Sequence, residues 1–134
     1  MSENPPFRFP VRVYWEDTDA GGVVFYANYL KFFERARTEW LRAAGVNQHA
    51  LREQSGGIFV VIETHVRYRQ AARLDDVLDI TVQVKEPGRI ALVLTQQALR
   101  GDTLVCEGDI RIAFVDADTL RPRRIPDSVL CHFA

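Results

Sequence analysis

Cysteine is scarce in this sequence: its 134 residues include only Cys106 and Cys131, which lie far apart and form no CxxC pair. This scarcity argues against a disulfide framework and against a cysteine-rich zinc site, and it is typical of free thiols in a reducing compartment. No run of about 18 apolar residues occurs, so we expect no membrane-spanning helix. The start, MSENPPFRFP, lacks the basic and apolar regions of a secretory signal. These absences predict a soluble, cytoplasmic protein.

Strong charge of one sign is also missing. The chain has 17 Lys and Arg residues against 18 Asp and Glu residues, a formal net charge of −1. Proteins that bind nucleic acid usually show a clear basic excess, so we expect no nucleic-acid partner. The three histidines are scattered and have no Ser or Cys partner at a catalytic spacing: His49, His65 and His132. We therefore expect neither a metal nor a cofactor, and any anion-binding site must be local.

The length suits a single domain over residues 1–134. Apolar and polar residues alternate from Phe7 to Trp15, which predicts a strand, and Pro10 within it favours an edge position because proline lacks the ladder N–H. The same alternation predicts four later strands, over residues 58–69, 76–85, 89–99 and 104–115. Short connections, with turn signals at Pro87-Gly88 and around Gly101, make the last three strands antiparallel neighbours.

One long helical pattern covers residues 28–44, with Asn28 in the place of an N-cap and Gly45 just after the C-terminus. Its apolar stripe is wide, which indicates a helix covered by a sheet. A shorter helix is expected over residues 48–53. A strand, a long helix and four strands together predict an α+β hot-dog fold, in which a curved antiparallel sheet wraps the central helix.

The acidic loop Glu16-Asp17-Thr18-Asp19-Ala20-Gly21-Gly22 lies between the first strand and the long helix. The aspartates could be turn and capping residues alone. A calcium loop that starts at Asp17 would need Glu at its twelfth position, where Asn28 stands, so this interpretation fails. An Asp-x-Asp phosphoryl-transfer site is typical of larger proteins with parallel sheets. The remaining interpretation is a catalytic carboxylate beside a helix start, where backbone N–H groups can hold an oxyanion.

A longer stretch makes this last interpretation specific. Residues 11–41, VRVYWEDTDAGGVVFYANYLKFFERARTEWL, resemble the signature of the 4-hydroxybenzoyl-CoA thioesterase-like hot-dog family. The resemblance is strongest to the Tol–Pal-associated acyl-CoA thioesterases within it. Two further segments match, RLDD at residues 73–76 and VDADTLRPRRIP at residues 115–126, so the resemblance covers essentially the whole chain.

The resemblance assigns roles to residues of this chain. Asp19 matches the family's catalytic carboxylate, as nucleophile or as general base, and the backbone N–H of Tyr26 would polarise the thioester carbonyl. Relatives usually carry His at the position of Tyr26, a change that a backbone role survives. Loop residues Gly22, Val23 and Phe25 are expected to contact the substrate. Glu34, on the helix that the motif includes, could support the catalytic carboxylate or contact the neighbouring subunit. From its spacing alone, we expect it to pair with Arg37 one turn away.

The resemblance implies hydrolysis of acyl-CoA thioesters by a homotetramer built from dimers, with active sites at the subunit interface. Whether the thioester is carried by coenzyme A or by acyl carrier protein stays open. Basic side chains should meet the phosphates of coenzyme A. Arg89 is the first choice, and the full set of candidates is Arg67, Arg69, Lys85, Arg89, Arg121, Arg123 and Arg124. A hot-dog hydratase or dehydratase and a non-catalytic acyl-binding module remain as alternatives.

Overall fold

The computed structural model describes residues 5–133. Residue 134 and residues 1–4, part of the stretch compared above with secretory signals, lie outside that range. The elements, in chain order, are β1 (Phe7–Arg12), η1 (Trp15–Asp17), α1 (Asn28–Ala43), α2 (Gln48–Ser55), β2 (Gly57–Tyr68), β3 (Val77–Glu86), β4 (Ala91–Arg100), β5 (Thr103–Asp116) and α3 (Asp127–Leu130).

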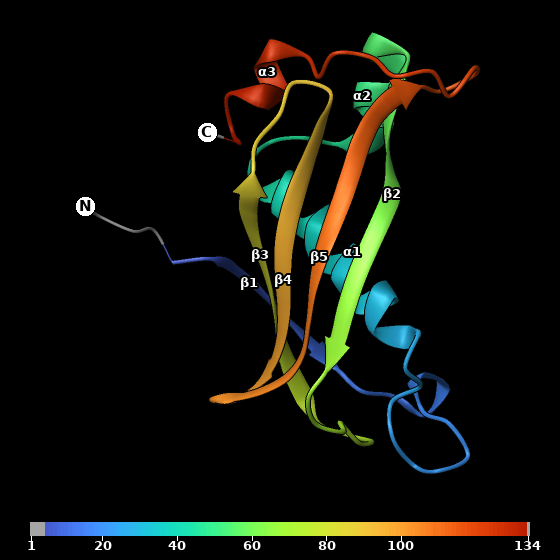
Figure 1. Ribbon diagram of the computed structural model, residues 1–134, viewed down its shortest axis with the longest axis vertical. Coiled ribbons are helices and arrows are strands. Elements are labelled where there is room, and N and C mark those ends of the chain that lie inside the picture. Colours follow the sequence, from blue (N-terminus) through green and yellow to red (C-terminus); the bar gives the residue numbers. More distant parts are fainter. Residues whose placement is uncertain (1–4, 134) are drawn as a thin grey trace.

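The five strands form one antiparallel sheet in the order β1-β3-β4-β5-β2. The predicted antiparallel neighbours β3, β4 and β5 are confirmed, and β1 is an edge strand, as Pro10 indicated. The other edge is β2, one of the longer strands at 12 residues. Figure 1 shows α1 lying obliquely across one face of this curved sheet, with α2 and α3 at the end opposite the loop that precedes α1.

The core lies between α1 and the sheet. Phe32, Phe33 and Ala36 on α1 are completely buried, and they face a sheet surface of aliphatic side chains that includes Leu78, Ile80, Leu92, Leu94 and Ile110. Each buried Phe contributes about 1.5–3 kcal/mol relative to an exposed one. Gly108 on β5 makes room for this packing, since a Cβ there would lie 3.3 Å from the ring of Phe33. The wide apolar stripe thus has the role that the sequence predicted.

A buried amide fixes α1 on the sheet. Gln96 of β4 is fully buried; its Nε2 donates to the carbonyls of Phe33 (3.0 Å) and Thr81 (3.2 Å). Its Oε1 accepts from Arg37 Nη1 at 2.9 Å. Burial lowers the pKa of Arg37. The expected Glu34–Arg37 ion pair is not formed within residues 5–133, because Arg37 turns inward to Gln96 instead.

Two boundaries near the loop differ from the prediction. The first strand ends at Arg12 rather than Trp15, because the chain turns into the 3-10 helix η1, where the Asp17 carboxylate accepts from Tyr14 N (2.8 Å). The N-cap of α1 is Ala27, and Asn28 is already the first helical residue. Gly45 does follow the helix in the left-handed conformation, with φ of 83°. No helix in the described part of the chain is long and apolar enough to cross a membrane.

Candidate active site

Asp19 lies at the base of a tight loop between η1 and α1. Its backbone N–H donates to Val23 O (2.9 Å), and its carbonyl accepts from Gly22 N (3.0 Å). Gly22 has φ of 81°, a conformation that glycine adopts without strain. The Asp19 side chain is exposed, and its Oδ1 accepts from Gly21 N at 2.8 Å. Its Oδ2 has no hydrogen-bond partner among residues 5–133, so one carboxylate oxygen is available for chemistry.

The returning arm of the loop is fastened to the segment that precedes β3. Val24 N donates to Ala72 O (2.8 Å), and Val23 forms an isolated bridge with Arg73. Val24 and Ala72 are buried, so this attachment belongs to the core. The position of Asp19 is therefore set by the core rather than by the loop alone.

Tyr26 lies where the loop enters α1. Within the described residues its backbone N–H has no acceptor, as expected for an N–H just ahead of a helix. Its carbonyl accepts from the hydroxyl of Tyr68, the last residue of β2, at 3.0 Å. Burial raises the pKa of Tyr68, so this hydroxyl remains protonated and able to donate. A free N–H at a helix N-terminus is what stabilisation of an oxyanion requires. The carboxylate on the same loop can act as a nucleophile or a general base.

The aromatic side chains at this point are exposed. Phe25 is 44% and Tyr26 63% exposed, and their ring centroids are 4.9 Å apart. The Tyr26 ring also meets the Tyr68 ring edge-on, with centroids separated by 6.2 Å. An exposed apolar surface on the loop that carries Asp19 suits an acyl group or a second subunit.

The structure brings most of the predicted site residues together. Asp19, Gly22, Val23, Phe25 and Tyr26 share one loop. Arg89 lies in the β3–β4 connection, at the end of the molecule opposite that loop (Figure 1). Tyr68 was missed, because its contact with Tyr26 spans 42 positions and nothing in the local pattern announces it. The contact of Asp17 with Asn28 was missed for the same reason.

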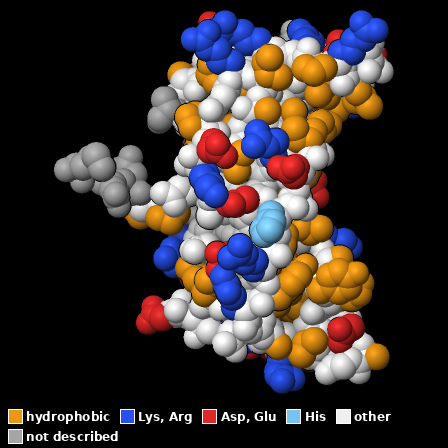
Figure 2. Space-filling model, viewed as in Figure 1, with side chains coloured by type: hydrophobic (Ala, Val, Ile, Leu, Met, Phe, Trp, Pro, Cys, Tyr) orange, Lys and Arg blue, Asp and Glu red, His pale blue; other side chains and the backbone are white. Residues whose placement is uncertain are grey.

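Several candidate phosphate-binding side chains already have anionic partners. Arg69 pairs with Glu107, Lys85 with Asp109, Arg123 with Asp116 and Arg124 with Asp127. Figure 2 shows charged side chains of this kind gathered over the middle of the outer sheet face. Within residues 5–133, Arg67, Arg89 and Arg121 make no ion pair, so they are the better candidates.

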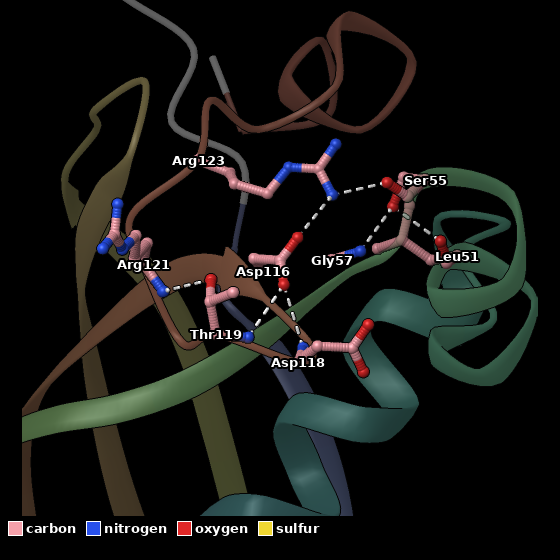
Figure 3. Close-up of polar contacts among 8 residues, drawn as sticks. All are labelled: Leu51, Ser55, Gly57, Asp116, Asp118, Thr119, Arg121 and Arg123. Carbon is pink, nitrogen blue, oxygen red and sulfur yellow. Dashed lines mark hydrogen bonds and ion pairs between the residues drawn. The ribbon is translucent and has the colours of Figure 1, made fainter.

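Figure 3 shows the arrangement around Arg123 at the end of β5. Arg123 Nη1 donates to Ser55 O at 2.6 Å and lies 3.8 Å from Asp116 Oδ2. Hydrogen bonds from the backbone N–H groups of Thr119 and Asp118 lower the pKa of Asp116. These contacts tie the end of α2 to the turn after β5, which makes Arg123 a structural residue and leaves Arg121 exposed beside it.

Neither thiol belongs to this loop. Cys106 is fully buried, and burial raises the pKa of its thiol to about 12, so it is not a nucleophile at neutral pH. Cys131 is exposed near the C-terminus. We predict that iodoacetamide alkylates native protein once, at Cys131, without loss of thioester hydrolysis, as checked by peptide mass spectrometry and turnover. Alkylation of Cys106 before unfolding would contradict its burial.

Comparison with known proteins places this geometry in a family. A model of the thioesterase-like superfamily matches residues 13–133. The acyl-CoA thioester hydrolase YbgC of Escherichia coli O6:H1 is 44% identical over 128 residues, 95% of each chain. The acyl-CoA thioesterase YbgC of Haemophilus influenzae is 42% identical over 95% of this chain and 93% of its own.

Solved structures agree with the sequence relatives. The crystal structure of a probable thioesterase from Bartonella henselae superposes with a TM-score of 0.86 at 33% identity, covering 91% of this chain and 100% of that one. This likeness confirms the predicted hot-dog fold, with α1 as the helix that the sheet wraps. By sequence match and by fold, the chain belongs to the thioesterase-like superfamily of hot-dog proteins.

Proposed function

We propose that this acyl-CoA thioesterase uses Asp19 as its catalytic carboxylate and the backbone N–H of Tyr26 as the group that polarises the thioester carbonyl. One observation carries the proposal. A carboxylate oxygen of Asp19 and the N–H of Tyr26 ahead of α1 lie on the same short loop, and neither has a hydrogen-bond partner among residues 5–133. Relatives named as acyl-CoA thioesterases, at 42–44% identity, supply the substrate class.

The reaction converts a thioester and water into a carboxylic acid and free coenzyme A. Asp19 either attacks the carbonyl carbon, giving an anhydride that water then hydrolyses, or takes a proton from the attacking water. In both routes the carbonyl oxygen gains negative charge, which the Tyr26 N–H and the N-terminal end of α1 stabilise. The carbon–sulfur bond then breaks and the thiolate leaves.

A hydratase or dehydratase is less well supported. Such hot-dog enzymes typically use an Asp–His pair, and the three histidines lie in α2, in β2 and after α3, away from the loop that carries Asp19. A non-catalytic acyl-binding module would have no use for an exposed carboxylate at the base of the loop. Only the thioesterase proposal gives both Asp19 and Tyr26 a role.

The proposed enzyme is a homo-oligomer, and β2 is the strand that supports this. It is an edge strand whose side chains Val61 and Ile62 are 46% and 54% exposed, an edge that invites pairing with another strand. Two β2 strands that pair antiparallel about a two-fold axis form one continuous sheet over two α1 helices. Two such dimers give the proposed tetramer.

Antiparallel pairing of two β2 strands also brings the end of β2 in one subunit close to the start of β2 in the other. Tyr68 at the end of β2 holds Tyr26, whereas Phe59 near its start lines a hollow of about 260 Å³ between α1 and the sheet. This hollow has apolar walls that include Leu41 and Ile112, and polar side chains also line it: Glu34, Arg37, Thr38 and Gln48. In the proposed dimer it opens toward the partner's Asp19 loop and receives the acyl group. Arg89 and Arg121, which form no ion pair within residues 5–133, lie at the same end of the molecule as this hollow, where they serve the phosphates of coenzyme A.

The test is hydrolysis by the purified protein of an acyl-CoA panel, from short aliphatic to aryl, followed by release of free thiol. We expect turnover of at least one acyl-CoA. The same acyl groups carried by acyl carrier protein are tested beside them. Faster hydrolysis of these thioesters would identify acyl carrier protein, rather than coenzyme A, as the carrier. A cytoplasmic location is part of the same proposal, since both carriers are cytoplasmic. Hydration of an enoyl-CoA without thiol release would favour the hydratase instead.

A further inference from the structure

Asp17 and Asn28 form a buried polar pair behind the catalytic loop. The two residues are 3% and 6% exposed, although both are polar. Asn28 Nδ2 donates to Asp17 Oδ1 at 2.7 Å, and the backbone N–H of Tyr14 donates to Asp17 Oδ2 at 2.8 Å. A buried carboxylate needs such donors, because burying it without them is costly. Both oxygens of Asp17 therefore accept hydrogen bonds, whereas in Asp19 only Oδ1 does so among residues 5–133.

Two backbone hydrogen bonds complete a ring with this pair. Phe25 N donates to Asp17 O (2.8 Å), and Asn28 N donates to Phe25 O (2.8 Å). Together with the side-chain bond from Asn28 to Asp17, they close a circuit of three residues. Tyr26 lies inside the closed turn, so the direction of its free N–H depends on the ring. The two backbone bonds cannot change without turning the 25–28 backbone, and the side-chain bond from Asn28 to Asp17 holds the two ends of this turn together.

We propose that Asp17 and Asn28 are positioning residues that aim the Tyr26 N–H at the thioester carbonyl, an inference that rests on the role proposed above for Tyr26. The pair is not a charge relay, because among residues 5–133 no other titratable side chain hydrogen-bonds to it. Charged residues on the adjoining segments include Glu16 of η1, Asp19 of the loop, Lys31 of α1 and Arg73 opposite Val23. All four are exposed, and within residues 5–133 none forms an ion pair with Asp17.

The test exchanges donor and acceptor. Asn28→Asp places two carboxylates face to face, where they cannot both be ionised without separating. Asp17→Asn alone is tolerated, because the Asn28 amide can turn to present its oxygen to the new donor. The double variant Asp17→Asn/Asn28→Asp restores one donor and one acceptor. Asn47→Asp, at the exposed N-cap of α2, is the matched control for the same chemical change.

We expect Asn28→Asp to lose about tenfold or more in kcat at pH 8, with little change in KM, as for a displaced oxyanion donor. Its kcat should recover as the pH falls and the pair takes up a proton. Asp17→Asn, the double variant and Asn47→Asp should stay within about threefold of wild type, without that pH dependence. A merely structural pair would instead lower the melting temperature and leave kcat of the folded protein unchanged at every pH.

Hydrogen–deuterium exchange of the peptide that covers residues 18–28 separates this inference from the proposed function. Exchange should accelerate in Asn28→Asp at pH 8 and return to the wild-type rate in the double variant, whether or not any thioester is hydrolysed. Wild-type exchange and kcat in Asn28→Asp would overturn the positioning role. The exchange could rise in Asn28→Asp and return in the double variant although the protein hydrolyses no thioester. That result would support the role of the ring in holding the loop and would refute the proposed activity.

Discussion

Replacement of Asp19 by Asn is expected to lower kcat for a good acyl-CoA by about 10²-fold or more, the size of loss typical of a missing general base. Asparagine keeps the side-chain oxygen that accepts from Gly21 N, so the loop retains its turn. It lacks the anionic oxygen, which in Asp19 is free of other hydrogen bonds and thus able to attack or to accept a proton. Binding of coenzyme A and the thermal melt should match wild type.

Glu16→Gln is the matched control for this prediction. Glu16 is an exposed carboxylate only three residues from Asp19. Its replacement by Gln removes the same unit of negative charge from the same end of the molecule. Its kcat should stay within about twofold of wild type, because an exposed charge is well screened by solvent. Equal losses in the two variants would mean that only the local negative charge matters. Full activity of Asp19→Asn would remove the loop as the catalytic site.

A lysine at Ile62 is expected to separate the subunits and to abolish most activity with them. Ile62 is exposed on the edge strand β2, and a charge on an edge opposes strand pairing. A two-fold dimer contains the substitution twice. A cost of about 2 kcal/mol per copy in the free energy of dimerisation therefore raises the dissociation constant of the dimer by roughly 10³-fold. The protein should then sediment near the 15.3 kDa of one chain at micromolar concentration.

The activity of Ile62→Lys should rise with protein concentration, because mass action restores the dimer. Ile90→Lys is the matched control: Ile90 is 47% exposed but lies before β4, away from the β2 edge. Analytical ultracentrifugation and turnover at several concentrations provide both readouts. A wild-type protein that sediments as a fully active monomer would contradict the site shared between subunits.

The fold was open to prediction because its signals are local. Alternation along residues 104–115 predicts a strand with one buried face. Burial in β5 alternates from Cys106 to Ile112, whereas both faces are buried from Ile112 to Val115. The glycine after the long helix and the turn at Gly101 are short-range backbone requirements, and both residues have positive φ. Asp19 was identified through a long family motif rather than through its spacing alone.

The missed features are side-chain choices made in three dimensions. Asn28 has the residue type and position of an N-cap, yet its amide serves Asp17 because the two meet inside the folded loop. Arg37 could have reached Glu34 on the same helix, but Gln96 of β4 offers a buried acceptor. The contact of Tyr68 with Tyr26 joins a strand end to a loop 42 residues earlier. The periodic pattern of apolar and polar residues does not indicate which of several possible acceptors a side-chain donor will bond.

The most direct measurement is a crystal structure of Asp19→Asn with an acyl-CoA that the variant cannot turn over. The account predicts the thioester oxygen about 2.7–3.1 Å from the Tyr26 nitrogen, and the side chain of residue 19 within about 3.5 Å of the carbonyl carbon or of one ordered water beside it. It also predicts the acyl group between two chains, in the hollow that Phe59 lines. A thioester bound away from this loop, or wholly within one chain, would contradict it.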